Sequence, residues 1–249
     1  MPQNPSPMTD STRAHRRLSQ SELPGGRAKL SLGTLLAPLK ARPGRKIPLL
    51  VHFHGAEWVA EQSGRQWNSR TAVLAVQIGS GSGVYASAFE TPGRFRALLD
   101  EAGARFGPVV VTCFSAGYGA VREILKDRAN WDRIDALVLA DSLHSDLDID
   151  AGQMRPFVDF ARQAAAKRKR MLVTHSEVFP GTFASTTQTA DYFLGQLGLK
   201  RRAVLKWGPL GMQQLSQARA GRFEMLGFAG NSAPDHIDHL HALAWWLKR

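Results

Sequence analysis

The fold of this chain is decided by one stretch of its sequence, Val109-Val110-Val111-Thr112-Cys113-Phe114-Ser115-Ala116-Gly117-Tyr118-Gly119-Ala120-Val121. A β-branched apolar run ends at Ser115, and a helical repeat of apolar residues begins directly afterwards. A serine on such a sharp turn has a strained backbone, so the residues two positions away must be small, and Gly117 supplies that room. Cys113 stands where the first glycine of the pattern G-x-S-x-G usually stands. The stretch therefore predicts a nucleophile elbow that presents the Ser115 hydroxyl.

Length and composition predict one large α/β domain, because the chain has 249 residues of which 43% are hydrophobic. A single cysteine excludes an intrachain disulfide. Residues 1–28 are rich in proline, serine and arginine with little apolar periodicity, which predicts a disordered basic tail preceding a domain over 29–249. No run of about 18 apolar residues is present, so we expect no spanning helix and a cytoplasmic protein.

The formal net charge of +11 raises nucleic acid or another anionic surface as a partner. The charge is distributed in short clusters, namely Arg16-Arg17, Lys167-Arg168-Lys169-Arg170 and Lys200-Arg201-Arg202. No nucleic-acid-binding motif accompanies these clusters. We interpret them as solvated surface, and a nucleic-acid partner is disfavoured.

Periodicity predicts alternating strands and helices from residue 47 to the C-terminus. Short strands are expected within 30–39 and a turn at Pro43-Gly44, followed by strands at 47–53, 71–78, 109–114, 136–140, 171–174 and 223–228. Helices are expected at 95–106, 157–169, 186–197 and 233–247. The strands are apolar throughout, which indicates a mostly parallel sheet buried between helices on both faces, a three-layer sandwich.

Function in such a sheet gathers at the carboxyl ends of the strands. The residues that follow these strands are His52, His54, Gly55, Ala56, Glu57, Ser82, Tyr85, Ser115, Asp141, His144, His175, Glu177 and the late histidines 236, 239 and 241. A serine hydroxyl is a weak nucleophile until a base takes its proton and an acid orients that base. Topology alone brings these residue types to one edge.

The chain resembles the α/β-hydrolase superfamily of the serine esterase and lipase type. The residues that carry the resemblance are Phe53-His54-Gly55-Ala56, Cys113-Phe114-Ser115-Ala116-Gly117 and Asp235-His236-Ile237-Asp238-His239. The resemblance implies an α/β-hydrolase domain, Ser115 as nucleophile and an oxyanion hole made by the backbone N–H groups of Ala56 and Ala116. It also implies cleavage of a small-molecule carboxylic ester through an acyl-enzyme, with no cofactor. Cys113 departs from the family pattern.

The base is chosen among three late histidines. Ser232 and Asp235 flank an early proline in the pattern of a capping box, which predicts a helix that begins near residue 233. His236 then lies in the first turn, close to the sheet edge, and is our preferred base. His239 and His241 lie deeper along the helix, and His239 is the main alternative.

The acid has two candidates. Asp141 ends a buried strand after the elbow helix, and Glu177 follows the next strand, where the family more often has its acid. We prefer Asp141, because aspartate is shorter and easier to hold rigidly, and we keep Glu177 as the alternative.

An alternative is that the late histidines bind a metal together with Asp235 and Asp238, and that His52 and His54 contribute to the same site. No known metallohydrolase spacing fits, so we expect no metal. Residues 79–83 match no phosphate-binding loop and no helix is expected to open directly after them, which indicates a flexible rim.

We expect His54, Trp58 and Tyr85 to line the substrate cleft. The connections 142–155 and 208–221 are short, so little or no lid is expected over an open cleft. The same residues would suit thioester, lactone or amide cleavage. The rival interpretation is an α/β-hydrolase fold that has lost catalysis and serves as a binding or scaffold protein.

Overall fold

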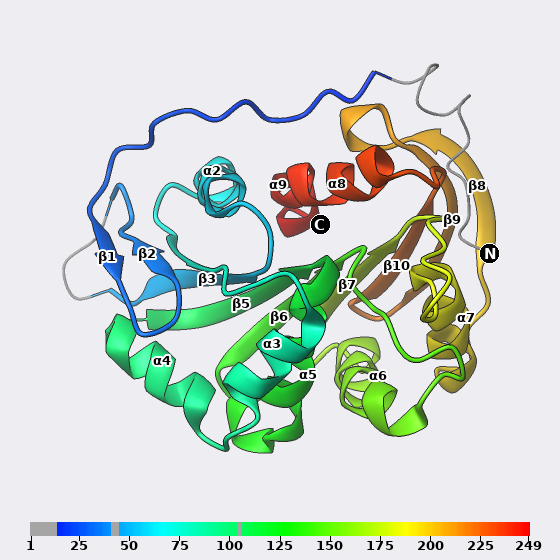
Figure 1. The fold of residues 1–249 in the computed structure, drawn as a ribbon, viewed down its shortest axis with the longest axis horizontal. Coiled ribbons are helices and arrows are strands. Elements are labelled where there is room, and N and C mark those ends of the chain that lie inside the picture. The colour runs from blue at the N-terminus through cyan, green and yellow to red at the C-terminus, as the bar shows by residue number, and fades with distance from the viewer. Residues whose placement is uncertain (1–13, 41–44, 104–105) are drawn as a thin grey trace. The chain divides into compact units, whose positions relative to one another are not determined.

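The computed structural model describes residues 14–40, 45–103 and 106–249 of the chain (Figure 1). The chain divides into two compact units. The first, here called the elbow unit, comprises residues 19–138 and 243–249. The second, here called the histidine unit, comprises residues up to Leu18 together with 139–242. The turn predicted at Pro43-Gly44 lies outside the described residues.

The strands of the elbow unit lie in the order β1 (Arg27–Lys29), β2 (Thr34–Leu36), β4 (Ala72–Val76), β3 (Ile47–Phe53) and β5 (Phe106–Phe114). β3 pairs in parallel with β4 and with β5, whereas β1 and β2 are antiparallel. Leu49, Leu50 and Val51 of β3 are fully buried. The strand expected at 47–53 is thus confirmed with the same bounds, and those expected at 71–78 and 109–114 are confirmed to within three residues, because dense apolar runs need burial on both faces.

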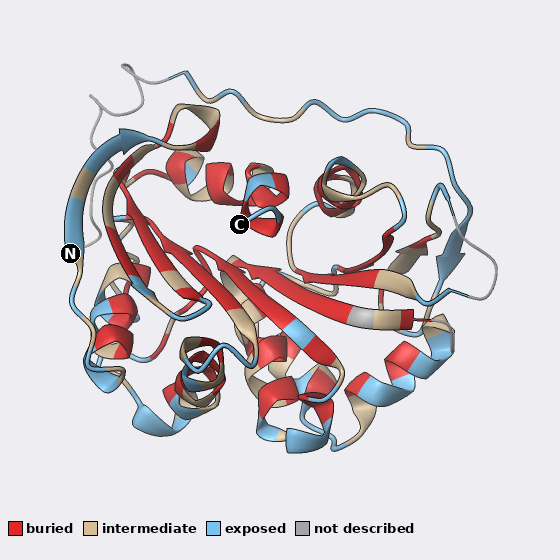
Figure 2. Cartoon of the chain, turned by 180° about the vertical axis from the view of Figure 1, so that it is seen from behind, coloured by how far each residue is buried: buried red, intermediate tan, exposed pale blue. Residues whose placement is uncertain are grey.

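The helices of the elbow unit are α2 (Glu57–Trp67), α3 (Ser82–Phe89), α4 (Arg94–Ala102), α5 (Tyr118–Lys126) and α9 (Leu243–Leu247). α4 buries one side, which carries Phe95, Leu98 and Leu99, whereas α2 is buried around most of its circumference over residues 59–64 (Figure 2). The expectation that no helix opens after residues 79–83 is wrong, because α3 begins at Ser82. α3 is fixed by packing against α5, a tertiary contact with no local sequence signal.

In the histidine unit, β10 (Phe223–Phe228) pairs in parallel with β7 (Arg170–His175) and antiparallel with β9 (Gln213–Ala220). β9 in turn is antiparallel to β8 (Arg202–Trp207). The expected strict alternation of strand and helix therefore fails between 202 and 220, and most of the connection 208–221 is strand β9. Polar residues interrupt β9, which suits a strand with one solvated face rather than a doubly buried one.

The helices of the histidine unit are α6 (Ala151–Ala165), α7 (Thr186–Gln196) and α8 (Ala233–His241). α6 begins six residues earlier than expected, because Asp150 caps it by accepting from the N–H groups of Gly152 and Gln153. The helix expected over 233–247 is two helices, α8 and α9, which part at Ala242. β6 (Ile134–Ala140) carries the chain from one unit to the other.

Of the predicted tail, residues 1–13 lie outside the described part of the chain, and residues from His15 onward form contacts. In the histidine unit, His15 Nδ1 and Arg17 Nε each lie 2.8 Å from a carboxylate oxygen of Asp238. In the elbow unit, Arg27 opens β1 and forms an ion pair with Glu61. Within the part of the chain that the structure describes, no helix has both the length and the apolar character to cross a bilayer.

Candidate active site

The elbow is a sharp strand-to-helix turn. β5 ends at Phe114, a single 3-10 turn covers Ser115–Gly117, and α5 follows at Tyr118. Ser115 has φ 45°, a left-handed conformation that is strained for a residue with a side chain. A Cβ at Gly117 would lie 2.3 Å from the carbonyl oxygen of Phe53. This close approach explains why the sequence needs a glycine two residues after the serine.

The packing of α5 against α3 requires a glycine at position 119. A Cβ at Gly119 would lie 2.1 Å from the carbonyl oxygen of Ser82, at the start of α3. Cys113, which replaces the usual first glycine, is fully buried beside Gly117. The N–H of Ala116 belongs to the 3-10 turn that leads into α5. The N-terminal end of a helix favours negative charge.

The loop after β3 is held beside this turn. His54 and Gly55 both have positive φ, 70° and 106°, and Ala56 then caps α2. The His54 ring stacks on Phe114 with 6.0 Å between ring centroids and meets Tyr85 edge-on at 5.4 Å. Because Phe114 directly precedes Ser115, this stacking holds the loop of Ala56 next to the elbow.

Hydrogen bonds to Gln77 and Tyr85 also hold this loop. The Gly55 N–H donates to Gln77 Oε1 at 2.9 Å, and the Tyr85 hydroxyl donates to the same oxygen at 2.9 Å. The Tyr85 hydroxyl also lies 3.1 Å from His54 Nδ1. The Gly55 N–H is thereby engaged in a hydrogen bond within the elbow unit. Tyr85, expected to line the cleft, is fully buried and supports the loop, whereas Trp58 is partly exposed.

In the histidine unit, Asp141 is the centre of a hydrogen-bond network. It follows β6 with φ 46° and is almost fully buried. Its Oδ2 lies 2.7 Å from His236 Nδ1 and accepts from the Ser176 hydroxyl at 2.6 Å. Its Oδ1 accepts from the Ser176 N–H at 2.9 Å and from the Thr186 hydroxyl at 2.5 Å. These four contacts hold the carboxylate in one orientation.

The electrostatics of this network favour the charged carboxylate. Burial acts to raise the pKa of Asp141, but the nearby imidazoles of His239 and His236 and the hydrogen bonds from His236 and Ser176 hold that pKa well below its usual value. An ionised Asp141 accepts a hydrogen bond from the Nδ1–H group of His236, and in that tautomer Nε2 is the ring nitrogen able to take a proton. The His236 side chain is 21% exposed, so it is reachable from outside its unit.

The other predicted candidates have different surroundings. His239 is buried, with its Nδ1 2.7 Å from Thr174 Oγ1 and its ring edge-on to Phe228. His241 Nδ1 accepts the N–H of Leu18 at 3.1 Å, and burial lowers the pKa of this imidazole. Glu177 accepts the Gly230 N–H at 3.3 Å through Oε2.

One cluster of metal-ligating residue types differs from the set considered in the sequence. His15, Asp235 and Asp238 each offer an atom within 4.8 Å of the others. Asp238 Oδ1 also forms an ion pair with Arg17 Nε at 2.8 Å. Asp235 forms the capping box of α8 together with Ser232. The Arg17 guanidinium therefore offsets the charge of one of the two carboxylates of this cluster.

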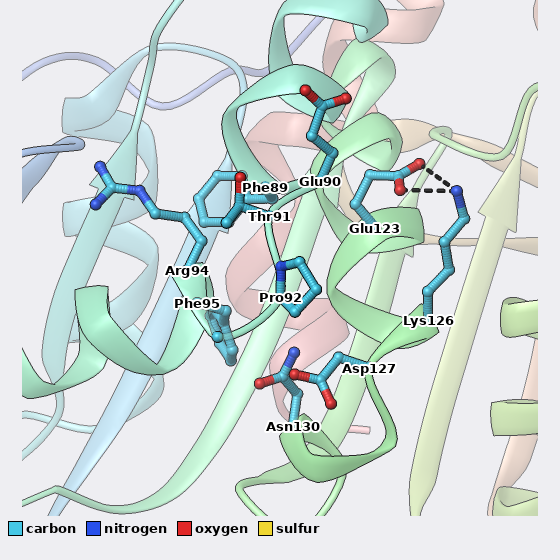
Figure 3. Close-up of a pocket in the computed structure, with 11 residues that line it drawn as sticks. Phe89, Glu90, Thr91, Pro92, Arg94, Phe95, Glu123, Lys126, Asp127 and Asn130 are labelled. Carbon is cyan, nitrogen blue, oxygen red and sulfur yellow. Dashed lines mark hydrogen bonds and ion pairs between the residues drawn. The ribbon is translucent and has the colours of Figure 1, made fainter.

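The elbow unit has a separate cavity of about 250 Å³ between α3, α4 and the far end of α5 (Figure 3). Its lining includes Glu90, Arg94 and the ion pair of Glu123 with Lys126, whose atoms lie 2.7 Å apart. None of the predicted site residues lines this cavity.

Sequence reasoning missed three residues that support the site. Ser176 follows β7 directly, so the rule that function gathers at strand ends could have identified it. Gln77 likewise follows β4. Thr186 begins α7 and reaches Asp141 from 45 residues away, with no local signal.

No family model and no curated protein sequence matches this chain. Solved structures that are similar to it include a thermostable esterase and a siderophore hydrolase. A thermostable esterase is 16% identical with a TM-score of 0.50 over 86% of this chain and 55% of that one, so the chain spans about half of that protein's length. The siderophore hydrolase EstB from Aspergillus nidulans is 10% identical with a TM-score of 0.50 over 94% of this chain and 95% of that one.

These likenesses are likenesses of fold. They confirm the predicted α/β-hydrolase fold: a mostly parallel sheet with some antiparallel strands, flanked by helices. The chain therefore has the fold of the α/β-hydrolase superfamily.

Proposed function

We propose that the protein is a serine hydrolase that cleaves carboxylic esters, with Ser115 as nucleophile, His236 as base and Asp141 as the orienting acid. The observation that carries the proposal is the 2.7 Å contact between His236 Nδ1 and the buried Asp141 carboxylate. The strained φ of Ser115 supports it independently, since strained backbone concentrates at functional sites. Of the similar structures described above, one is named as an esterase and the other as a siderophore hydrolase.

The proposed reaction has two halves. His236 Nε2 takes the proton of the Ser115 hydroxyl as Oγ attacks the acyl carbon, and then gives that proton to the leaving alcohol. Water attacks the resulting acyl-enzyme with the same imidazole as base, which releases the acid and restores Ser115. Asp141 stays ionised throughout and stabilises the imidazolium that forms in each half.

Two backbone N–H groups form the proposed oxyanion hole. Those of Ala56 and Ala116 stand at the starts of α2 and of the 3-10 turn, where helix ends favour developing negative charge. They would bind the oxyanion of the tetrahedral intermediate. The proposed substrate is a small, accessible ester, and thioester, lactone or amide cleavage would use the same groups. The reaction as drawn uses no cofactor.

A fluorophosphonate probe tests the proposal, because it labels a serine only where a base activates the hydroxyl. We expect the full chain to be labelled, to hydrolyse short-chain p-nitrophenyl esters, and to lose both properties in Ser115→Ala. Ser87→Ala, on the exposed surface of α3, is the matched control and should retain both. An unlabelled and inactive wild-type chain that melts cooperatively would instead support a binding or scaffold protein.

The size of the substrate is tested separately. With little lid expected, short-chain p-nitrophenyl esters should be hydrolysed faster than long-chain triglycerides. Efficient cleavage of triglycerides together with inertness toward short esters would contradict an open cleft while leaving the roles of the three residues intact.

A further inference from the structure

The edge strand β8 carries two large apolar side chains that the fold leaves exposed. Leu205 and Trp207 are 76% and 74% exposed, the highest values among the large hydrophobic residues that are exposed. They lie two residues apart on β8, which is the last strand in the sheet order and whose described pairing is with β9. Figure 2 shows β8 as exposed along most of its length. An exposed tryptophan and leucine on one short strand indicate an interaction surface.

The sequence around these side chains is rich in basic residues, two of which, Arg201 and Arg219, form ion pairs with Asp191 and Glu224. Between Asp191 and Glu224 the sequence has no acidic residue but six basic ones: Lys200, Arg201, Arg202, Lys206, Arg219 and Arg222. Arg202 and Lys206 belong to β8 itself and are exposed. A partner for this surface must therefore tolerate apolar side chains and bring negative charge.

A second copy of the chain fits this surface poorly. The register of β8 shifts between Ala203 and Lys206, and a bulge together with basic residues are the features by which edge strands resist pairing. Antiparallel pairing of two β8 strands would also place Arg202 of one copy near Lys206 of the other. Like charges placed opposite one another in neighbouring strands are destabilising.

We propose that the β8 edge, comprising Leu205, Trp207, Arg202, Lys206 and Lys200, is a docking surface for an anionic lipid bilayer. Tryptophan favours the boundary between acyl chains and headgroups, and leucine partitions into the apolar layer beneath it. Lysine and arginine of the same edge are attracted to acidic headgroups. Nucleic acid would satisfy the charge but offers no apolar layer for Leu205.

The docking would be peripheral and reversible. Each basic residue near an anionic surface strengthens binding by about fivefold, and the attraction declines within a Debye length. Two inserted side chains add a contribution that salt does not screen. We therefore expect binding that weakens with salt and that requires both kinds of residue.

The test uses the full chain with sucrose-loaded vesicles of neutral phosphatidylcholine, alone or with phosphatidylglycerol. We expect sedimentation with the anionic vesicles, little with the neutral ones, and quenching of tryptophan fluorescence by lipids brominated in the upper acyl chain. Leu205→Ser with Trp207→Ser should lower the partition coefficient by about tenfold or more and remove most of the quenching. Trp245→Ser, at a tryptophan of α9 that is 58% exposed, is the matched control and should change neither.

The electrostatic part has its own pair of variants. Arg202→Gln with Lys206→Gln should weaken anionic binding by about tenfold or more, whereas Arg70→Gln with Arg96→Gln removes the same charge from exposed positions of the elbow unit and should not. Circular dichroism melting verifies that each variant is folded.

Four results would overturn the proposal. These are absence of vesicle binding by the folded wild type, equal binding to neutral and anionic vesicles, binding that survives the Leu205 and Trp207 changes, and a wild-type dimer that those changes dissociate. Tight, salt-sensitive binding of DNA without vesicle binding would likewise replace it with a nucleic-acid surface. None of these results depends on the proposed ester hydrolysis.

Discussion

Asp141 Oδ2 lies 2.7 Å from His236 Nδ1, although 95 positions separate the two residues in the sequence. The contact joins the end of strand β6 to the first turn of helix α8. Because Asp141 is buried and held by Ser176 and Thr186 as well, the imidazole rather than the carboxylate has freedom to adjust. This geometry supports the proposal that Asp141 is the orienting acid and His236 the base.

Replacing Asp141 by asparagine should lower kcat for a p-nitrophenyl ester on the order of 10³-fold or more, because an amide offers the wrong hydrogen-bonding pattern to Nδ1 and does not stabilise an imidazolium. KM should change little. Glu177→Gln is the matched control and should remain within about twofold of wild type in kcat. A large loss in Glu177→Gln with an active Asp141→Asn would reverse the two roles.

His236 and His239 should separate activity from stability. His236→Gln should reduce ester hydrolysis to the background that the oxyanion donors alone supply, with little change in melting temperature. His239→Gln disturbs the buried contact with Thr174 and should lower the free energy of unfolding by about 1–3 kcal/mol. Its fluorophosphonate labelling below the melting point should persist. Labelling that disappears in a folded His239→Gln variant would argue for His239 as the base.

Local patterns predicted those features that local forces decide. The strands 47–53 and 223–228 are dense apolar runs, and the structure has them as β3 and β10 with the same bounds. The capping box of Ser232 and Asp235 located the start of α8 at residue 233 and so put His236 in its first turn. The elbow glycine pattern reflects steric contacts that any such turn must satisfy.

Features that depend on distant partners could not be predicted in this way. The hairpin of β8 and β9 mixes polar and apolar residues, and no residue of β8 is buried, so the sequence has no dense apolar run there to predict a strand. α3 is fixed by its packing on α5, and the low polarity of its sequence gave no amphipathic pattern. Thr186 supports Asp141 through a hydrogen bond across 45 positions, for which single-sequence reasoning has no signal, whereas Ser176 stands at a strand end where the rule for such sheets could have identified it.

The elbow glycines should tolerate no side chain. Gly117→Ala and Gly119→Ala would each force a Cβ against a backbone carbonyl oxygen, at 2.3 Å and 2.1 Å, so we expect a loss of unfolding free energy of several kcal/mol or failure to fold. Gly195→Ala, in α7 with no atom within 4 Å of the added Cβ, is the control and should be neutral or stabilising by up to about 1 kcal/mol. Denaturant titration of the three variants measures this, and unchanged stability in Gly117→Ala would contradict the close approach.

Tyr85 should act on the rate through the loop that it supports. Tyr85→Phe removes the hydroxyl that contacts Gln77 and His54, so the loop of Ala56 would be less rigidly placed and kcat should decline by about tenfold or more at nearly constant KM. Tyr118→Phe removes a hydroxyl bonded to Ser82 and is the control. Equal kcat losses in both variants, or a loss seen in KM alone, would show that Tyr85 does not position an oxyanion donor.

Buried His52 should make stability depend on pH on the acid side of neutrality. Burial lowers the pKa of His52 from 6.5 to about 4, so the folded chain keeps this imidazole neutral where the unfolded chain protonates it. The unfolded state then binds more protons between pH 6.5 and about 4, and the free energy of unfolding declines as pH falls through that window. His52 alone should contribute about 2 kcal/mol of loss between pH 6.5 and 5.

His52→Asn tests this dependence, because an amide can still bond Thr112, which lies 2.8 Å from His52 Nδ1, but does not titrate. Guanidinium unfolding at pH 7 and pH 5 should show a smaller difference between the two pH values in the variant than in the wild type. His175, whose pKa burial lowers to about 3, should account for part of the remaining slope. A variant whose stability falls with acid as steeply as that of the wild type would mean that His52 is already protonated in the folded chain or stays neutral in the unfolded one.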